Sequence, residues 1–398
     1  MPAALELNPF SYEFHEDPYP TYRRLRDEAP LYRNETLGFW ALSRYRDVLS
    51  ASLEWETYSS AEGTTLERMD PAYFEARPMI IFLDPPRHDR LRRLVSRAFT
   101  PRRVAALEPF VRATVGRLLD AVAREGGGDF VHDVSMPLPM EVIFTLLGVP
   151  EGDRRQVREW MDLSLERDRD TPAIPERAMI AMVSMMQYWP DFVENLRRKP
   201  DDGLVSALLT AEVEDDDGTP TRLTDGEIIG FCNLIGSAGN ETVTKLLANA
   251  CVLFARHPEQ YRTILDDPGA IPDAVEEVLR HTSPSQYQGR VTTRDVTWHG
   301  ETVPKGSRIL LLTGSANRDE REFPDPDRFD VRRQPEQHLA LGQGVHFCLG
   351  ASLARLESRV ALEEFSRRFP RYTVDEGRCV RVHMSNVHGY EHVPFAAA

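Results

Sequence analysis

The stretch that most constrains this chain runs from residue 341 to residue 350, Leu-Gly-Gln-Gly-Val-His-Phe-Cys-Leu-Gly, directly ahead of an expected amphipathic helix. Glycine reaches left-handed backbone dihedrals without steric penalty, so the three glycines let the backbone turn sharply and approach a flat ligand. A sulfur held there would meet the orphan N–H groups that open the helix, which favour an anion. A lone cysteine is usually a small buried hydrophobe, but these surroundings predict that Cys348 is a low-pKa thiolate that binds a metal.

This run resembles the haem-binding loop of the cytochrome P450 superfamily, Phe-Gly-x-Gly-x-His/Arg-x-Cys-x-Gly, with Leu341 in place of the usual Phe. The resemblance implies that Cys348 is the axial ligand of haem b, and a thiolate in that position favours O–O cleavage. It covers essentially the whole chain. It implies a mainly α fold with a small β part, the family's triangular helical prism around a buried haem, formed by residues 1–398 as one domain.

A second motif is the Glu-x-x-Arg of Glu277 and Arg280, within a stretch of helical periodicity. Glu and Arg three residues apart are usually a solvated surface pair that contributes little. In the superfamily that this chain resembles, the pair is buried and joins a later arginine, for which Arg328 is the candidate. The resemblance therefore implies a structural role, which is to hold the segment that leads into the cysteine loop.

A third motif, Gly-Ser-Ala-Gly-Asn-Glu-Thr at residues 236–242, lies midway along a helix expected from about 224 to 255. Glycine and serine weaken a helix interior, and Thr242 can hydrogen-bond back to the carbonyl of Ala238. The resemblance implies a distortion that opens a groove for dioxygen, with Glu241 and Thr242 as the acid–alcohol pair that delivers protons. The alternative is a close packing contact at the glycines, with Thr242 merely capping a kink.

Haem carries two propionates, which need partners when the cofactor is buried. His88 and Arg92 are four residues apart and so share one face of an expected helix. By resemblance both contact a propionate, as do Arg290 and His346.

The expected secondary structure is mainly helical. Helical periodicity marks residues 101–124, 225–255 and 350–368, and also 176–198, where Pro190 should kink or divide the helix. Strands are expected at residues 291–296, 307–313 and 378–382. The acidic, turn-rich stretch 212–220 is expected to be an exposed loop.

The chain contains no run of 18 apolar residues, and its N-terminus lacks a basic region followed by an apolar core. We therefore expect a cytoplasmic protein of the bacterial type that does not associate with membranes. The four cysteines show no paired spacing, which argues against zinc sites and a disulfide framework.

The formal net charge of −15 argues against nucleic acid as a partner. Residues 87–103 run against this trend, with seven arginines and one acid. The candidates for the surface are Arg90, Arg93, Arg97, Arg102 and Arg103. This segment is either a solvated basic face or a docking patch for a small acidic electron carrier, since complementary charge steers encounter. We expect a ferredoxin-type carrier with its reductase, which draws on NAD(P)H.

Together the motifs predict a monomeric haem-thiolate monooxygenase that inserts one atom of O₂ into a lipophilic small molecule such as a steroid, terpenoid or polyketide. By resemblance, the substrate pocket is lined by Phe82, Asn233, Ala238, Gln286, Gln288, Asn386 and Val387. A peroxide-driven haem-thiolate enzyme and a non-catalytic haem or ligand sensor are the alternatives. Turnover with a reductase and O₂, compared with turnover with peroxide, distinguishes the three.

Overall fold

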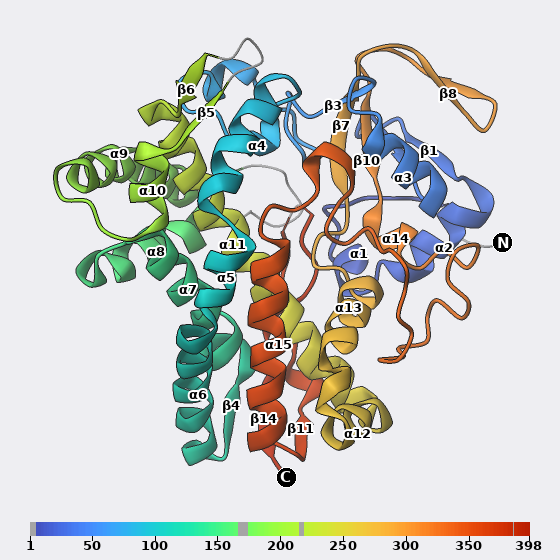
Figure 1. Ribbon diagram of the computed structural model, residues 1–398. Helices are drawn as coiled ribbons and strands as arrows, with labels where there is room; N and C mark the ends of the chain where they lie inside the picture. The colour runs from blue at the N-terminus through green and yellow to red at the C-terminus, as the bar shows by residue number, and fades with distance from the viewer. Residues whose placement is uncertain (1–4, 166–173, 215–218, 385) are drawn as a thin grey trace.

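The computed structural model describes residues 5–165, 174–214, 219–384 and 386–398. It is mainly helical with small sheets, which confirms the predicted fold class. The helical part fills the centre and left of Figure 1, and the N-terminal segments lie with the largest sheet on the right.

The α-helices are α1 Tyr12–Glu16, α2 Tyr19–Glu28, α3 Tyr45–Leu53, α4 Arg87–Ala98, α5 Pro101–Ala106, α6 Glu108–Glu125, α7 Pro137–Leu147, α8 Glu151–Leu165, α9 Glu176–Arg198, α10 Leu204–Thr210, α11 Asp225–Arg256, α12 Pro258–Asp266, α13 Ile271–His281, α14 Thr313–Ala316 and α15 Ala351–Arg368. Short 3₁₀ turns are η1 Pro71–Phe74, η2 Ile80–Phe82, η4 Pro268–Ala270, η5 Gly344–His346 and η6 Glu376–Arg378, and η3 Val131–Ser135 is a π-helical turn.

The largest sheet has the strand order β1-β2-β10-β7-β3. Strands β2 and β10 pair in parallel, with Ile309 opposite Trp40, and the other pairs of this sheet are antiparallel. Its strands are β1 Leu31–Asn34, β2 Phe39–Leu42, β3 Tyr58–Ser59, β7 Gln288–Thr292 and β10 Arg308–Leu311. A second sheet has the order β11-β14-β4, from β4 Gly127–Asp129, β11 Tyr372–Val374 and β14 Pro394–Ala397. The remaining strands form the pairs β5 Glu212–Glu214 with β6 Pro220–Arg222, β8 Val296–Trp298 with β9 Glu301–Val303, and β12 Val380–Arg381 with β13 Tyr390–His392.

Helix α11 passes through the largest hydrophobic core and packs against α7, α9 and α15. A capping box fixes its start, since Thr224 Oγ1 accepts the N–H of Glu227 and the Glu227 carboxylate accepts the N–H of Thr224. Its length and buried apolar positions explain why the helix persists through residues of low helix propensity.

The first turns of α11 lie directly against the chain segment that leads into η2. A Cβ atom at Gly226 would lie 2.0 Å from the carbonyl oxygen of Ala76, and one at Gly230 would lie 2.3 Å from that of Pro78. Because both neighbours are backbone atoms, only glycine permits this approach. Backbone contact with α11 therefore sets the position of residues 76–78.

Several expected elements differ from those observed. The helix expected at 101–124 is two helices, α5 and α6, which meet at Leu107. Pro190 lies inside α9 without dividing it. The strand expected at 291–296 spans the end of β7 and the start of β8, and the ends of the loop expected at 212–220 pair as β5 and β6, while residues 215–218 lie outside the described residues.

Among the residues that the structure describes, none of the helices combines the length and the apolar character that crossing a membrane requires.

Candidate active site

The cysteine loop folds back on itself ahead of α15. Gly342 and Gly344 take left-handed φ angles of 71° and 69°, which explains the need for glycine at both positions. The N–H of Cys348 donates to the carbonyl of Leu341 at 2.8 Å, and α15 begins three residues after the cysteine, at Ala351. The loop thus holds the thiol at the N-terminal end of α15, as predicted.

Opposing effects act on the pKa of the Cys348 thiol. Burial raises the pKa of Cys348, although a hydrogen bond from the Gly350 N–H and the charge of Arg92 oppose that rise. Sequence reasoning counted the helix terminus but could not weigh the loss of solvent, which is the larger effect here.

The four residues predicted to hold propionates come together near the cysteine. The rings of His88 and His346 lie 4.6 Å apart, and His346 is electrostatically coupled to Arg290 and Arg92. Arg92 is in turn coupled to Cys348. The four basic residues come from α4, β7 and η5, so the fold joins segments that are far apart in the sequence.

This cluster concentrates positive charge in a buried place. Burial lowers the pKa of Arg290 to about 10 against the opposing charge of Asp84. Burial and the charges of Arg290, His88 and Arg92 lower the pKa of His346 to about 2. Because buried charges require partners, a group with two carboxylates would relieve the cluster. The residues present therefore fit a haem with its two propionates.

The predicted acid–alcohol pair lies on α11. Thr242 Oγ1 donates to the carbonyl of Ala238 at 3.0 Å, which confirms the back-bond expected from the sequence. Glu241 forms an ion pair with the buried Lys245, with 3.1 Å between Oε2 and Nζ. Sequence reasoning missed Lys245, although its position four residues after a glutamate on one helix is a readable signal.

The glycines of this motif serve close packing. Helix α11 is continuous from Asp225 to Arg256, so the predicted distortion does not break it. Cβ atoms at Gly236 and Gly239 would press on the ends of the Met161 and Ile143 side chains, at 2.2 and 2.9 Å. This supports the packing alternative for the glycines and leaves the role of Thr242 open.

The Glu277–Arg280 pair is fully buried, and the two side chains meet through two hydrogen bonds of 2.7 and 2.8 Å. The predicted third member, Arg328, is wrong. Its side chain is 66% exposed, and only its carbonyl oxygen meets Arg280. Arg333 takes that place, with its Nε 3.2 Å from the Glu277 carboxylate.

The buried pair reaches the cysteine loop through Asn317. Arg280 donates to the carbonyl of Asn317 at 2.8 Å, and the side-chain oxygen of Asn317 accepts the N–H of Leu339 at 2.7 Å. Glu276, the neighbour of Glu277, binds His338 at 3.0 Å and Arg355 of α15 through two hydrogen bonds. These contacts hold both the entry to the cysteine loop and the helix that follows it.

The residues predicted to line a substrate pocket come from several elements. The backbone N–H of Gln286 donates to the carbonyl of Asn386, and Val387 forms a β-bridge with Ser285, so these two segments lie side by side. Asn233 and Ala238 lie on α11, and Phe82 ends η2, with its ring 4.7 Å from that of Phe74. The Gln286 amide is buried and donates to the carbonyl of Ser283, and Gln288 donates to Ser285 Oγ at 2.8 Å.

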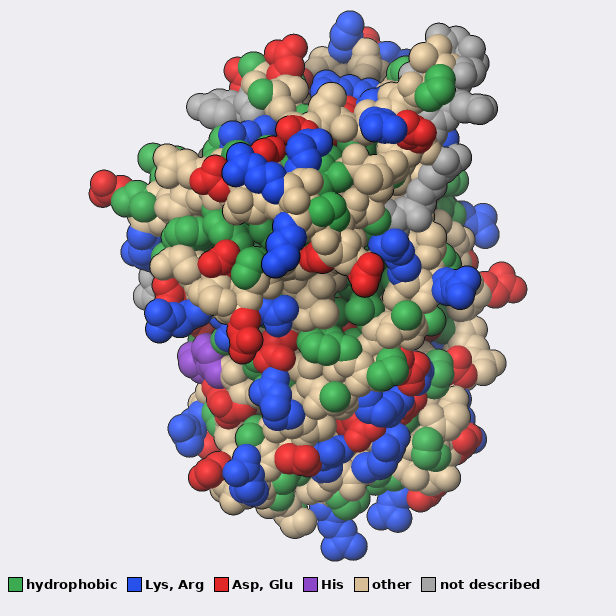
Figure 2. Space-filling view, turned by 60° about the vertical axis from the view of Figure 1, so that its left-hand side comes forward, with side chains coloured by type: hydrophobic (Ala, Val, Ile, Leu, Met, Phe, Trp, Pro, Cys, Tyr) green, Lys and Arg blue, Asp and Glu red, His purple; other side chains and the backbone are tan. Residues whose placement is uncertain are grey.

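Of the arginines in segment 87–103 that were predicted for the surface, Arg93, Arg102 and Arg103 are exposed. Arg90 is not a free surface charge, because it forms an ion pair with Glu227 of α11 at 2.7 Å. The side chain of Arg97 lies outside the described residues. Arg102 and Arg103 of α5 are exposed, and neither forms an ion pair within the described parts of the chain. Figure 2 shows basic and acidic side chains interleaved across one face of the molecule rather than one extended basic surface.

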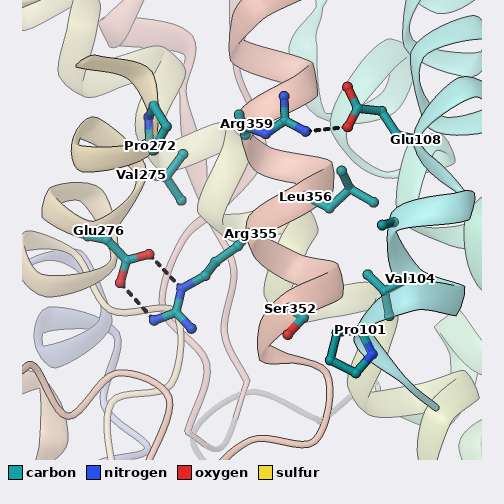
Figure 3. A pocket seen from close by; sticks show the side chains of 11 residues that line it. Pro101, Val104, Glu108, Pro272, Val275, Glu276, Ser352, Arg355, Leu356 and Arg359 are labelled. Carbon is teal, nitrogen blue, oxygen red and sulfur yellow. Dashed lines mark hydrogen bonds and ion pairs between the residues drawn. The ribbon is translucent and has the colours of Figure 1, made fainter. Parts of the chain in front are cut away.

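A hollow of about 340 Å³ lies between α5, α13 and α15 (Figure 3). Its walls include apolar side chains such as Val104 and Leu356. Its basic side chains are paired, Arg355 with Glu276 and Arg359 with Glu108. One of its lining residues, Ser352 of α15, lies four residues after Cys348 in the sequence.

The profile of the family described as Cytochrome P450 matches residues 271–385. The Mycobacterium bovis protein designated cytochrome P450 123 is 46% identical over 394 residues, which cover 98% of this chain and 97% of that protein. The vitamin D(3) 25-hydroxylase of Pseudonocardia autotrophica is 39% identical over 360 residues, or 89% of this chain and 86% of that protein. The structure of CYP109E1 from Bacillus megaterium in complex with corticosterone matches with a TM-score of 0.86 at 32% identity, over 97% of this chain and 99% of that one. Because sequence and fold agree over nearly its full length, this chain belongs to the cytochrome P450 family of monooxygenases.

Proposed function

We propose that this cytochrome P450 inserts one oxygen atom of O₂ into a lipophilic small molecule of the steroid, terpenoid or polyketide kind. The observation that carries the proposal is the cluster of the buried His88 and Arg290 with the partly buried Arg92 and His346, next to the thiol of Cys348. One site thus offers a sulfur ligand for iron and basic side chains for two carboxylates.

In this proposal Cys348 binds the iron of haem b, and the four basic residues bind its propionates. The bound haem would supply the activation of O₂ and take up two electrons. The protein positions the sulfur through the Leu341 carbonyl and the start of α15, and Arg92 adds positive charge beside the thiolate. His346 would donate a ring N–H to a propionate, and the arginines would supply positive charge.

Thr242 and Glu241 would handle protons. The Thr242 hydroxyl donates a hydrogen bond to the Ala238 carbonyl, so the hydroxyl oxygen can still accept a hydrogen bond. The Glu241 carboxylate is held by Lys245. To pass a proton toward Thr242, Glu241 must first receive one, and we assign to Lys245 the role of holding the carboxylate in place.

The substrate class rests on the residues around the proposed pocket and on two relatives. Phe82 and Val387 are apolar, whereas Asn233, Gln288 and Asn386 offer a few polar groups, as suits a lipophilic ligand with one or two oxygens. One relative is named as a vitamin D(3) hydroxylase, and the structure of another was solved in complex with corticosterone. Both molecules are steroid-like.

For the electron donor we propose a small acidic carrier of the ferredoxin type, served by an NAD(P)H-dependent reductase. The hollow beside α15 is apolar, and its own arginines are already paired. Arg102 and Arg103 lie on α5, which contributes Pro101 and Val104 to the same hollow. An acidic partner that contacts α5 would meet these two exposed positive charges, of which Arg103 lines a second hollow with Asp201 and Ser206. We also retain the predictions of a monomer and of a single domain, and the continuous core that runs from Val95 to Phe395 supports the single domain.

Two measurements test the proposal. The reduced protein with carbon monoxide should show the strongly red-shifted Soret band of thiolate haem, and Cys348→His should lose that band. Absence of haem from intact protein, or a histidine-type spectrum in the wild type, would contradict the cofactor assignment. Product formation with reductase, carrier and O₂, exceeding that with peroxide, supports the proposed electron route, and the reverse result refutes it.

A further inference from the structure

A cluster of metal-ligating side chains lies where β4 of the second sheet, η3 and β13 meet, in a part of the fold that the proposed reaction does not use. Asp129, His132 and His392 each offer one ligand atom, and these three atoms all lie within 4.8 Å of one another. From this geometry we infer a binding site for a divalent transition metal of the zinc type, formed by one carboxylate and two imidazoles.

The fold brings these residues together from positions far apart in the sequence. Asp129 ends β4, and His132 lies in η3 just after it. His392 ends β13 and is followed by β14, which pairs with β4, so that Asp129 lies opposite Pro394. Strands β4 and β14 run side by side at the lower end of the molecule in Figure 1.

The carboxylate is already oriented as a ligand. Asp129 Oδ1 accepts the N–H groups of Val131 and Val393 at 3.0 and 3.2 Å, which fixes the plane of the group. Its Oδ2 points at His392 Nδ1, 2.8 Å away. Hydrogen bonds that hold a ligand from behind are typical of metal sites.

His132 completes the set from the solvent side. Its ring lies 4.7 Å from that of His392. It is exposed, and its ring nitrogens make no hydrogen bond within the described parts of the chain. Ligand atoms bound to one Zn²⁺ at about 2.0–2.2 Å lie roughly 3–4 Å apart, so a modest rotation of this free side chain closes the set. Water would fill the remaining coordination positions.

Two imidazoles and one carboxylate suit Zn²⁺ better than Mg²⁺ or Ca²⁺, which prefer oxygen ligands. The cysteine spacing excluded a cysteine-based zinc site, and this cluster contains no cysteine. A bound ion would join β4 and η3 to the C-terminal strands, and binding to the folded state alone stabilises that state.

The test uses tag-free holoprotein stripped of loose metal by a chelator and dialysed. Titration calorimetry with Zn²⁺ should show one site per chain at micromolar concentration, and zinc should raise the unfolding temperature. His132→Ala should weaken binding by at least about tenfold and abolish the thermal shift. Asp129→Asn keeps the Oδ1 acceptor for the backbone and should also weaken binding, because the anionic ligand is lost.

The chain provides a matched control in His299, which pairs with Asp47 at 2.7 Å and lies outside any three-ligand cluster of the described residues. His299→Ala should bind zinc like the wild type. Binding that appears only at millimolar zinc, or a site that survives His132→Ala unchanged, would overturn the inference. An anomalous peak at the zinc edge between the three side chains in a soaked crystal supports it, and a peak elsewhere refutes it. None of these readouts depends on haem turnover.

Discussion

Replacing Arg280 by alanine tests the buried network most directly. Arg280 is fully buried, and its side chain donates to both carboxylate oxygens of Glu277. It also donates to the carbonyls of Asn317 and Pro326, at 2.8 and 2.9 Å. The substitution leaves a buried carboxylate without its main partner and two carbonyls without donors.

The loss of stability depends on the hydrogen bonds that Glu277 keeps after the substitution. Breaking a buried ion pair on one side costs about 3–5 kcal/mol. Glu277 would still accept the N–H of Asp330 at 2.9 Å and Arg333 Nε at 3.2 Å, which moderates the loss. A cost in this range is a large part of the roughly 5–15 kcal/mol that stabilises most domains. We therefore expect Arg280→Ala to give little folded holoprotein, because the entry to the cysteine loop loses its support.

Two other arginines of the same region give the controls. Arg333→Ala removes one charge-assisted hydrogen bond to Glu277 and should cost about 1.5–3 kcal/mol. Arg328→Ala removes an exposed side chain 3.7 Å from Asp330 and should cost at most about 1 kcal/mol. Haem content per polypeptide and urea unfolding followed by Soret absorbance and circular dichroism should rank the damage Arg280, Arg333, Arg328. Full haem loading with an unchanged midpoint in Arg280→Ala, or equal damage from the two other variants, would refute this account.

Three further outcomes are expected. Thr242→Ala should keep haem content but divert electrons from NAD(P)H to peroxide, because the variant lacks the hydroxyl on α11; an unchanged ratio of product to NAD(P)H contradicts this role. Burial raises the pKa of Glu357 to about 8 from the model-compound value of 4.5. The folded state therefore favours the protonated carboxyl group. This contribution to stability is complete below about pH 4.5 and is lost as the pH rises through 8. At about 1.36 kcal/mol per pKa unit, the free energy of unfolding of the wild type should fall by a few kcal/mol relative to that of Glu357→Gln between these pH values. Urea midpoints measured across this pH range test the prediction. If the midpoints of the two proteins change in parallel with pH, Glu357 does not titrate in this way. Replacing Arg102 and Arg103 together by Glu should slow reduction by a ferredoxin at low salt with little change in substrate affinity, whereas equally fast and equally salt-sensitive reduction would place the donor elsewhere.

Local patterns predicted much of the fold and the positions of the main candidates. The capping box and apolar positions of α11 are readable from neighbouring residues, as is the back-bond from Thr242 to Ala238. Lys245 was equally readable by its spacing from Glu241. Helix α9 shows the limit, because tertiary packing kept it continuous through Pro190.

Contacts set by irregular loops were beyond sequence reasoning. Arg333 rather than Arg328 meets Glu277 because the backbone turns sharply between residues 323 and 333, with a left-handed φ of 46° at Asp325. The raised pKa of Cys348 depends on how completely the fold removes solvent from the thiol. The cluster of Asp129 with His392 depends on strand pairing across more than half of the chain.

The contact between α11 and residues 76–78 bears on how such an enzyme changes its substrates. Two glycines of the helix contact two backbone carbonyl groups of the loop, so this contact does not depend on the side chains of the loop. A substitution just beyond it, such as one at Phe82, which we propose lines the substrate pocket, changes the ring contact with Phe74 but does not touch these backbone contacts. Libraries aimed at new substrates should therefore randomise this loop and leave Gly226 and Gly230 unchanged. A single methyl group at either glycine would displace the backbone of residues 76–78 and with it the loop that the library varies.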